Sequence, residues 1–230
     1  SVLALSTWMF IWLPTINPTT YYLFLKSKNL SLKGRNQEAV VLSERIIKKD
    51  PLFLSAYPLL TDIYQRQGKR SDALKYYFDY ALFSEKKHSN SDLASAYTGI
   101  AWIYHLNGDY PKAFDFYGKA IALSRENNDK LNEAVALRKL AVWYMDKNDY
   151  QASLELLTKS SEINRQRQDV FAYRYNLACD YFDIGLVFSN KDDLAAAADF
   201  YSKSRVLFEK LKLKSELGDY YFNLGELYLF

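Results

Sequence analysis

The sequence predicts an all-α protein, built as a right-handed α-solenoid of stacked antiparallel helix hairpins. One helix-turn-helix pattern recurs along the 230 residues, with small, aromatic and turn-forming residues at the same offsets each time. A repeat of this length is typical of a solenoid, in which each unit buries its faces against its neighbours. Composition agrees, because 49% of the residues are apolar while only 8 are Gly and 5 are Pro.

The copies of the pattern begin near Thr20, Leu54, Ala94, Ala134, Ala178 and Gly218. They start 34, 40, 40, 44 and 40 residues apart, and the last copy is incomplete. The array is therefore predicted to occupy residues 20–230, after an apolar segment over residues 1–19. Because each hairpin of a solenoid contacts its neighbours, no boundary inside the array is expected.

Each copy opens with an amphipathic helix. A small residue stands at the eighth position, where two helices must approach closely: Ser27, Thr61, Ala101, Ala141, Gly185 and Gly225. Apolar residues stand four and one positions before it and three after it, which places them on one helical face. In the copy that begins at Ala94 these residues are Tyr97, Ile100 and Tyr104.

A turn and a second helix complete each copy. The turn is centred on residue types that tolerate the left-handed conformation, namely Gly34, Gly68, Gly108, Asn148 and Asp192. Five residues later comes another small residue, and then a large one such as Tyr117 or Tyr201. Packing is thus the expected role of most of the 20 tyrosines. The six extra residues of the longer copies are expected to lengthen the flanking helices, by roughly 9 Å in total.

This pattern resembles the tetratricopeptide repeat family over residues 20–230, most clearly from Tyr97 to Ala120. The resemblance implies that the first helices line a concave groove that binds a protein or peptide segment. Mapped position by position, it selects as candidate ligand-binding residues Asp62, Arg66, Trp102, His105, Arg138, Val142, Phe182 and Leu186. The Lys, Asn and Arg set with which some family members hold a peptide carboxylate is absent, which argues against chaperone-tail binding.

The candidate groove has an apolar centre flanked by arginines. The centre consists of Trp102, Val142, Phe182 and Leu186, and the flanking arginines are Arg66 and Arg138. Interface hot spots often combine an aromatic anchor with an arginine, so an extended or helical peptide is a reasonable ligand. The alternative, that Trp102 only packs against the neighbouring helix, stays open.

Other chemistries find little support. A net charge of +3 does not indicate nucleic-acid binding, and the single Cys179 excludes an internal disulfide or a cysteine-based zinc cluster. The chain has two histidines and no phosphate-binding loop or zinc-protease motif. Asp180 and Asp183 share a helical face and are expected to be ion-paired or solvated. The sequence therefore predicts a protein that is not an enzyme and that has no cofactor and no metal.

The two ends of the chain suggest additional contacts. Val2 to Leu13 is apolar and uncharged but too short to span a bilayer. It matches a signal-peptide core or the end of a longer anchor, which favours membrane contact and a membrane-anchored or exported protein over a cytoplasmic one; the alternative is a helix packed on the first hairpin. At the other end, Tyr221 to Phe230 reads as a first helix without a second, which further chain or a partner is expected to cover.

The predicted function is that of a non-enzymatic scaffold whose groove binds a protein or peptide. The alternative is the sensory or input region of a larger signalling or regulatory protein, possibly anchored at a membrane. In that case ligand binding would change the curvature of the array, and a domain outside this sequence would respond to the change.

Overall fold

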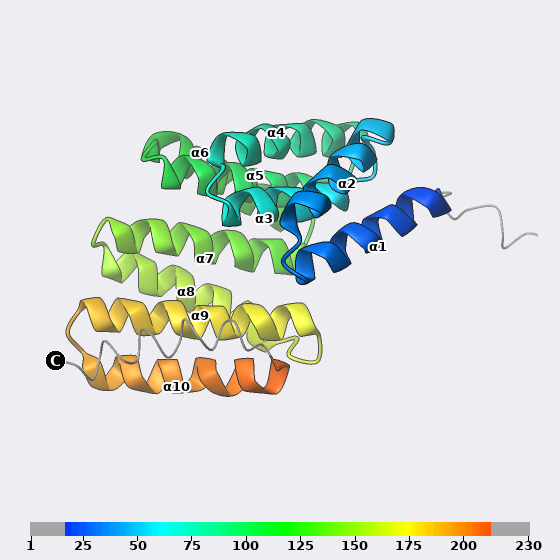
Figure 1. The fold of residues 1–230 in the computed structure, drawn as a ribbon. Coiled ribbons are helices and arrows are strands. Elements are labelled where there is room, and N and C mark those ends of the chain that lie inside the picture. Colours follow the sequence, from blue (N-terminus) through cyan, green and yellow to red (C-terminus); the bar gives the residue numbers. More distant parts are fainter. Residues whose placement is uncertain (1–16, 213–230) are drawn as a thin grey trace, which may run out of the picture. The chain divides into compact units, whose positions relative to one another are not determined.

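A computed structural model describes residues 17–212, which form ten α-helices and no strand (Figure 1). The helices alternate along the chain as the first and second members of five hairpins. Their bounds are α1 (Pro18–Leu32), α2 (Asn36–Lys49), α3 (Ala56–Arg66), α4 (Arg70–Lys86), α5 (Asn90–Leu106), α6 (Tyr110–Glu126), α7 (Lys130–Asp146), α8 (Tyr150–Arg165), α9 (Phe171–Asn190) and α10 (Leu194–Leu211). The predicted all-α solenoid class is confirmed.

The described chain divides into two compact units between Lys87 and His88. The first unit holds α1 to α4 and the second holds α5 to α10. The sequence does not indicate this division, because the repeat continues on both sides of it. Within the second unit, Figure 1 shows α7 to α10 as successive rods joined by short connections.

The predicted turn residues adopt the left-handed conformation. Gly34, Gly68 and Gly108 have φ values of 74°, 70° and 78°, and Asn148 and Asp192 both have 60°. Backbone in this region closes a helix and redirects the chain. His88 and Asn128 also have a φ of 53°, so the connections between hairpins use the same device.

Aspartate side chains fix the beginnings of four helices in the second unit. The carboxylates of Asp109, Asp129, Asp149 and Asp193 each accept a hydrogen bond from the backbone N–H three residues later. Such N-caps satisfy amide groups that have no partner inside the helix and typically contribute about 1 kcal/mol each. An aspartate is therefore the residue directly before each of these four helices.

The small positions lie where paired helices meet. Ser27, Thr61 and Ala101 have no exposed surface, and neither do Ala113 and Ala197 on the second helices. Large residues fill the space beside them, with Tyr117 and Tyr201 buried and Tyr57 stacked on Tyr80 at a centroid distance of 5.5 Å. The predicted structural use of these tyrosines is confirmed.

The longer copies of the second unit have longer helices, whereas α3 in the second copy has only 11 residues. The first hairpin has helices of 15 and 14 residues, whereas α5, α6 and α7 each have 17 and α9 has 20. No helix among residues 17–212 is long and apolar enough to cross a membrane. The apolar run at residues 2–13 and the last predicted helix at residues 221–230 lie outside the described residues.

Candidate functional site

The first helices of the second unit form one continuous face. α5 contacts α7, and α7 contacts α9, while each also packs against the second helix of its own hairpin. We define the first-helix face by six partly exposed side chains of these three helices: Trp102, Arg138, Lys139, Val142, Phe182 and Leu186. Five of these six residues are candidates from the sequence; Lys139 is the exception.

Trp102 is held from two sides. The Nζ of Lys139 lies 3.9 Å from the centroid of the Trp102 ring, which is a close cation–π contact. The ring of His105 meets Trp102 edge-on at a centroid distance of 5.2 Å. His105 is itself buried, and its Nε2 lies 2.8 Å from Oδ2 of Asp146. His105 therefore positions the indole from below and is not itself an exposed groove residue.

Arg138 extends toward α9. Its Nη1 donates to Oδ2 of Asp183 at 3.1 Å, and its Nε lies 3.9 Å from Oδ1 of Asp180. Only 14% of the Arg138 side chain is exposed. Of the two expected states, ion-paired or solvated, Asp183 is ion-paired, and its partner is the arginine that the sequence placed at the edge of the groove. Asp180 is neither solvated nor as close to that arginine. Arg138 thus joins α7 to α9.

Asp180 is fully buried and has a dense set of polar neighbours. Asn164 donates from Nδ2 to Oδ2 of Asp180 at 2.7 Å, and Oγ of Ser160 lies 2.8 Å from Oδ1. The same Ser160 hydroxyl donates to the Ala134 carbonyl at 3.0 Å, as Ser204 does to Ala178 in the next hairpin. A hydroxyl has one proton, so when Ser160 gives it to Ala134 the contact with Asp180 needs a proton on the carboxyl group.

The environment favours that proton. Burial raises the pKa of Asp180 to about 7, against the opposing effects of Arg138, Asn164 and Ser160. Burial also raises the pKa of the neighbouring Cys179 thiol, which disfavours the reactive thiolate form. Among residues 17–212 no group of three or more His, Cys, Asp or Glu side chains is arranged to hold a metal ion.

The apolar part of the first-helix face continues onto α9. Phe182 is half-buried, with its ring 5.5 Å from that of Tyr201, and Leu186 packs in the same cluster. Val142 on α7 is half-buried as well. These side chains are fixed by packing on one side and retain exposed surface on the other.

The two candidates of the first unit behave differently. Asp62 and Arg66 lie one turn apart on α3, are exposed, and form an ion pair with a distance of 2.8 Å between Oδ2 and Nη2. Nη2 of Arg66 also donates to Oγ of Ser31 at 2.9 Å. Their charges therefore offset one another on the surface of this unit.

Lys139 is the member of the site that the sequence does not indicate. It stands next to Arg138, at a position that the family resemblance does not assign to the groove. Burial lowers the pKa of Lys139 to about 8, and the charge of Arg138 contributes to this decrease. The sequence contains one signal that could have identified Lys139. It directly follows the groove candidate Arg138, and the preceding hairpin contains the groove candidate Trp102.

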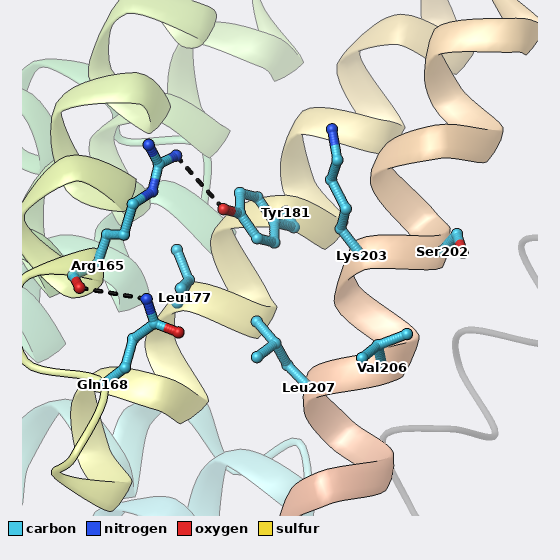
Figure 2. A pocket seen from close by; sticks show the side chains of 8 residues that line it. All are labelled: Arg165, Gln168, Leu177, Tyr181, Ser202, Lys203, Val206 and Leu207. Carbon is cyan, nitrogen blue, oxygen red and sulfur yellow. Dashed lines mark hydrogen bonds between the residues drawn. The ribbon is translucent and has the colours of Figure 1, made fainter.

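A separate hollow of about 300 Å³ lies among α9, α10 and the end of α8 (Figure 2). Leu177, Val206 and Leu207 line it, together with polar side chains at its edge. Figure 2 shows Arg165 donating to the hydroxyl of Tyr181; the two atoms are 3.4 Å apart. Lys203 forms an ion pair with Asp199, whose side chain is not drawn in this view. Because its cations already have partners, this hollow is less suited to an anionic ligand than the first-helix face.

Comparisons with known proteins agree on the repeat. The family profile for the tetratricopeptide repeat matches residues 90–166. No curated protein matches the chain in sequence.

Among solved structures, BtubC (BKLC) from P. vanneervenii is similar, with a TM-score of 0.63 and 19% identity over 85% of this chain and 81% of that one. A putative kinesin light chain repeat protein from Podosopora anserina gives 0.59 and 15% over 84% and 96%. A Rap protein complexed with competence and sporulation factor gives 0.74 and 10%; the likeness covers 87% of this chain but 56% of the Rap protein. At these identities the similarity concerns the fold.

Proposed function

The chain belongs to the tetratricopeptide repeat family, and we propose that the first-helix face of its second unit binds a peptide segment of another protein. The observation that supports this most strongly is the setting of Trp102. Its indole is fixed by Lys139 and by His105, yet it retains exposed surface. A rigid, partly exposed aromatic side chain is the usual centre of a binding hot spot.

The surroundings of Trp102 suit an extended or helical peptide. Val142 lies on the next first helix and Phe182 and Leu186 on the one after, so apolar surface is offered by three successive helices. Alternate or i, i+3, i+4 side chains of a peptide could contact such a series. The largely buried ion pair of Arg138 with Asp183 joins α7 to α9 within this face.

Pre-organisation is the second reason for the proposal. Ordering a flexible side chain on binding costs about 0.5–1.5 kcal/mol, and this cost is avoided where the side chain is already fixed. His105 is bonded to Asp146, and Phe182 is packed on Tyr201. A ligand would therefore meet a surface that is largely formed before binding.

Peptide display tests this proposal directly. The intact chain is immobilised and used to select from a library of random dodecapeptides, and the affinities of the recovered peptides are measured by fluorescence anisotropy. Trp102→Ala is expected to weaken binding by roughly 30-fold, as expected for loss of a hot-spot side chain of about 2 kcal/mol. The matched control is Phe114→Ala on α6, which removes an exposed aromatic ring from outside the face.

The outcomes are separable. Recovery of peptides that bind both variants equally would show that the first-helix face is not the site. Failure to recover any peptide would contradict peptide binding itself. Circular dichroism of each variant establishes that the helices are intact, because Trp102 also contributes packing.

The second candidate function is the input region of a larger signalling protein. It is favoured by the fold similarity to the Rap protein complexed with competence and sporulation factor, of which the likeness covers only part. In this case a bound peptide is expected to change the dimensions of the array. Small-angle X-ray scattering with and without a selected peptide measures this change, and an unaltered radius of gyration would count against the input role.

A further inference from the structure

We propose that the ammonium group of Lys139 is the receptor for one carboxylate of the bound peptide, so that the partner of the first-helix face is an acidic, apolar segment. This inference rests on the proposed function and specifies its ligand. Three features of Lys139 support it: its lack of an ionic partner, the charges around it, and the neighbouring indole.

Lys139 differs from three other lysines of the second unit that lie over aromatic rings. Lys112 over Tyr104, Lys119 over Phe116 and Lys203 over Phe200 each also contact an aspartate, at Nζ–Oδ2 distances of 2.7, 2.7 and 2.5 Å. Lys139 lies closer to its ring, at 3.9 Å, and has no ion pair or hydrogen bond with any of residues 17–212. Lys147 and Lys191 also lie over aromatic rings without a carboxylate partner in the described part of the chain, but both are exposed. Lys139 is therefore the more enclosed cation without a carboxylate.

The charged groups around Lys139 leave one positive charge unmatched. On α7 its neighbour is Arg138, whose guanidinium already contacts Asp183. On α9 the titratable neighbours are Asp183 and Cys179, and burial raises the pKa of the Cys179 thiol. From α5 it faces Trp102, behind which His105 is paired with Asp146. Asp180 lies against Arg138 and is not among the groups that act on Lys139, so Arg138 serves both aspartates and Lys139 remains without a carboxylate of its own.

An enclosed cation without a counter-ion is costly, and the lowered pKa of Lys139 is the consequence of that cost. A ligand carboxylate would supply the missing counter-ion and form a charge-assisted hydrogen bond with the ammonium group, worth about 1.5–3 kcal/mol. Trp102, Val142 and Phe182 offer apolar surface to residues beside the carboxylate. The first-helix face therefore favours a segment that combines an acidic group with apolar side chains.

Binding is expected to depend on pH with a defined sign. A bound carboxylate raises the pKa of Lys139, so the complex retains a proton that the free protein loses above about pH 8. Affinity should be nearly constant below pH 7.5 and fall by roughly ten- to thirtyfold between pH 7.5 and pH 9.5. Lys139→Met should abolish this decrease, whereas the control Lys119→Met, which removes a lysine that lies over Phe116 and has its own aspartate, should retain it.

The experiment uses two C-terminally amidated pools of random dodecapeptides, one with Glu and one with Gln fixed at the centre, titrated against the intact chain. The Glu pool is expected to bind about ten- to a hundredfold more tightly than the Gln pool, and Lys139→Met should remove the difference. A third pool, with Gln at the centre and a free C-terminal carboxylate, distinguishes a terminal from a side-chain carboxylate. Urea unfolding of Lys139→Met establishes that it folds.

Each outcome decides a separate point. Equal binding of the amidated Glu pool, the amidated Gln pool and the free-carboxylate pool would overturn the carboxylate receptor and leave peptide binding in place. A preference for carboxylate that survives in Lys139→Met would assign the receptor to another cation. Binding of no pool would contradict the proposed function as well.

Discussion

Gly185 on α9 lies directly against the ring of Tyr201 on α10. A Cβ atom added at position 185 would be 2.7 Å from two carbons of that ring. No real Cβ is tolerated at such a distance, so the two helices can pack this closely only because position 185 has no side chain. The same relationship between a small residue and its partner helix recurs in each hairpin and produces the repeat pattern in the sequence.

Gly185→Ala is therefore expected to destabilise the protein. Either Tyr201 or the backbone of α9 must shift, and overpacking of this kind typically costs about 1–3 kcal/mol. Gly118→Ala is the control, because Gly118 also lies inside a helix but a Cβ atom added there would meet nothing within 4 Å. It should be neutral or stabilising by up to about 1 kcal/mol. Urea unfolding of both variants gives the comparison, and equal effects would contradict the packing account.

The buried carboxyl group of Asp180 predicts a pH-dependent stability. Its pKa is about 7 in the folded protein, above the ordinary value of 3.8, so between about pH 4 and pH 7 the folded state binds a proton that the unfolded state has released. This group therefore makes the protein less stable as pH rises through that window, with a slope of up to about 1.4 kcal/mol per pH unit.

Comparison with Asp180→Asn isolates this effect from all other titrations. The free energy of unfolding is measured at pH 5 and pH 7 for both proteins, and the wild-type protein should lose more stability than the variant over this interval. Parallel changes in the two proteins would show that Asp180 is ionised throughout, and that Arg138 compensates for its burial.

Arg138 is predicted to stabilise the second unit and not to act only on a ligand. Arg138→Met leaves Asp183 without its partner, and breaking a largely buried ion pair commonly costs about 3–5 kcal/mol. The double variant Arg138→Met/Asp183→Leu should recover part of this loss, because it leaves no unpaired charge. Thermal unfolding of the parent, Arg138→Met, Asp183→Leu and the double variant provides the measurement, and additive losses would exclude coupling between the two residues.

The turn at Asn148 supplies a further prediction. With a φ of 60°, this residue adopts a conformation that suits glycine and disfavours a β-branched side chain. Asn148→Val should destabilise the hairpin of α7 and α8 by about 1–2 kcal/mol, whereas Asn148→Gly should be tolerated. Denaturant midpoints of the two variants, compared with the parent, test the assignment, and a stable valine variant would contradict it.

The fold can be predicted from the sequence because its determinants are local and repeated. Each characteristic position of the pattern serves a contact within one hairpin or with the next, as Ala101, Tyr104 and Gly108 do. The same positions recur in the other copies. The division between Lys87 and His88 leaves no such mark. Helix lengthening follows from the spacing alone, since extra residues without proline or glycine extend helices.

The site is less predictable because its members are joined across hairpins. Trp102 and Lys139 come from different copies, and only the packing of α5 on α7 brings Nζ over the indole. The sequence indicates Arg138 as a ligand contact, yet its neighbours Asp180 and Asp183 read as a separate pair. Whether a charged side chain is free or already paired depends on contacts between distant residues, and spacing does not encode them.

The most direct test of the first-helix face as a binding surface is fluorine NMR of the intact chain labelled with 5-fluorotryptophan. The chain has four tryptophans, and Trp143, which packs against Tyr110 and Tyr144, is an internal control for Trp102. Trp102→Phe and Trp143→Phe assign the two resonances. Adding a selected acidic peptide should shift the Trp102 resonance and leave that of Trp143 in place. A peptide that binds with no change at Trp102 would contradict the account.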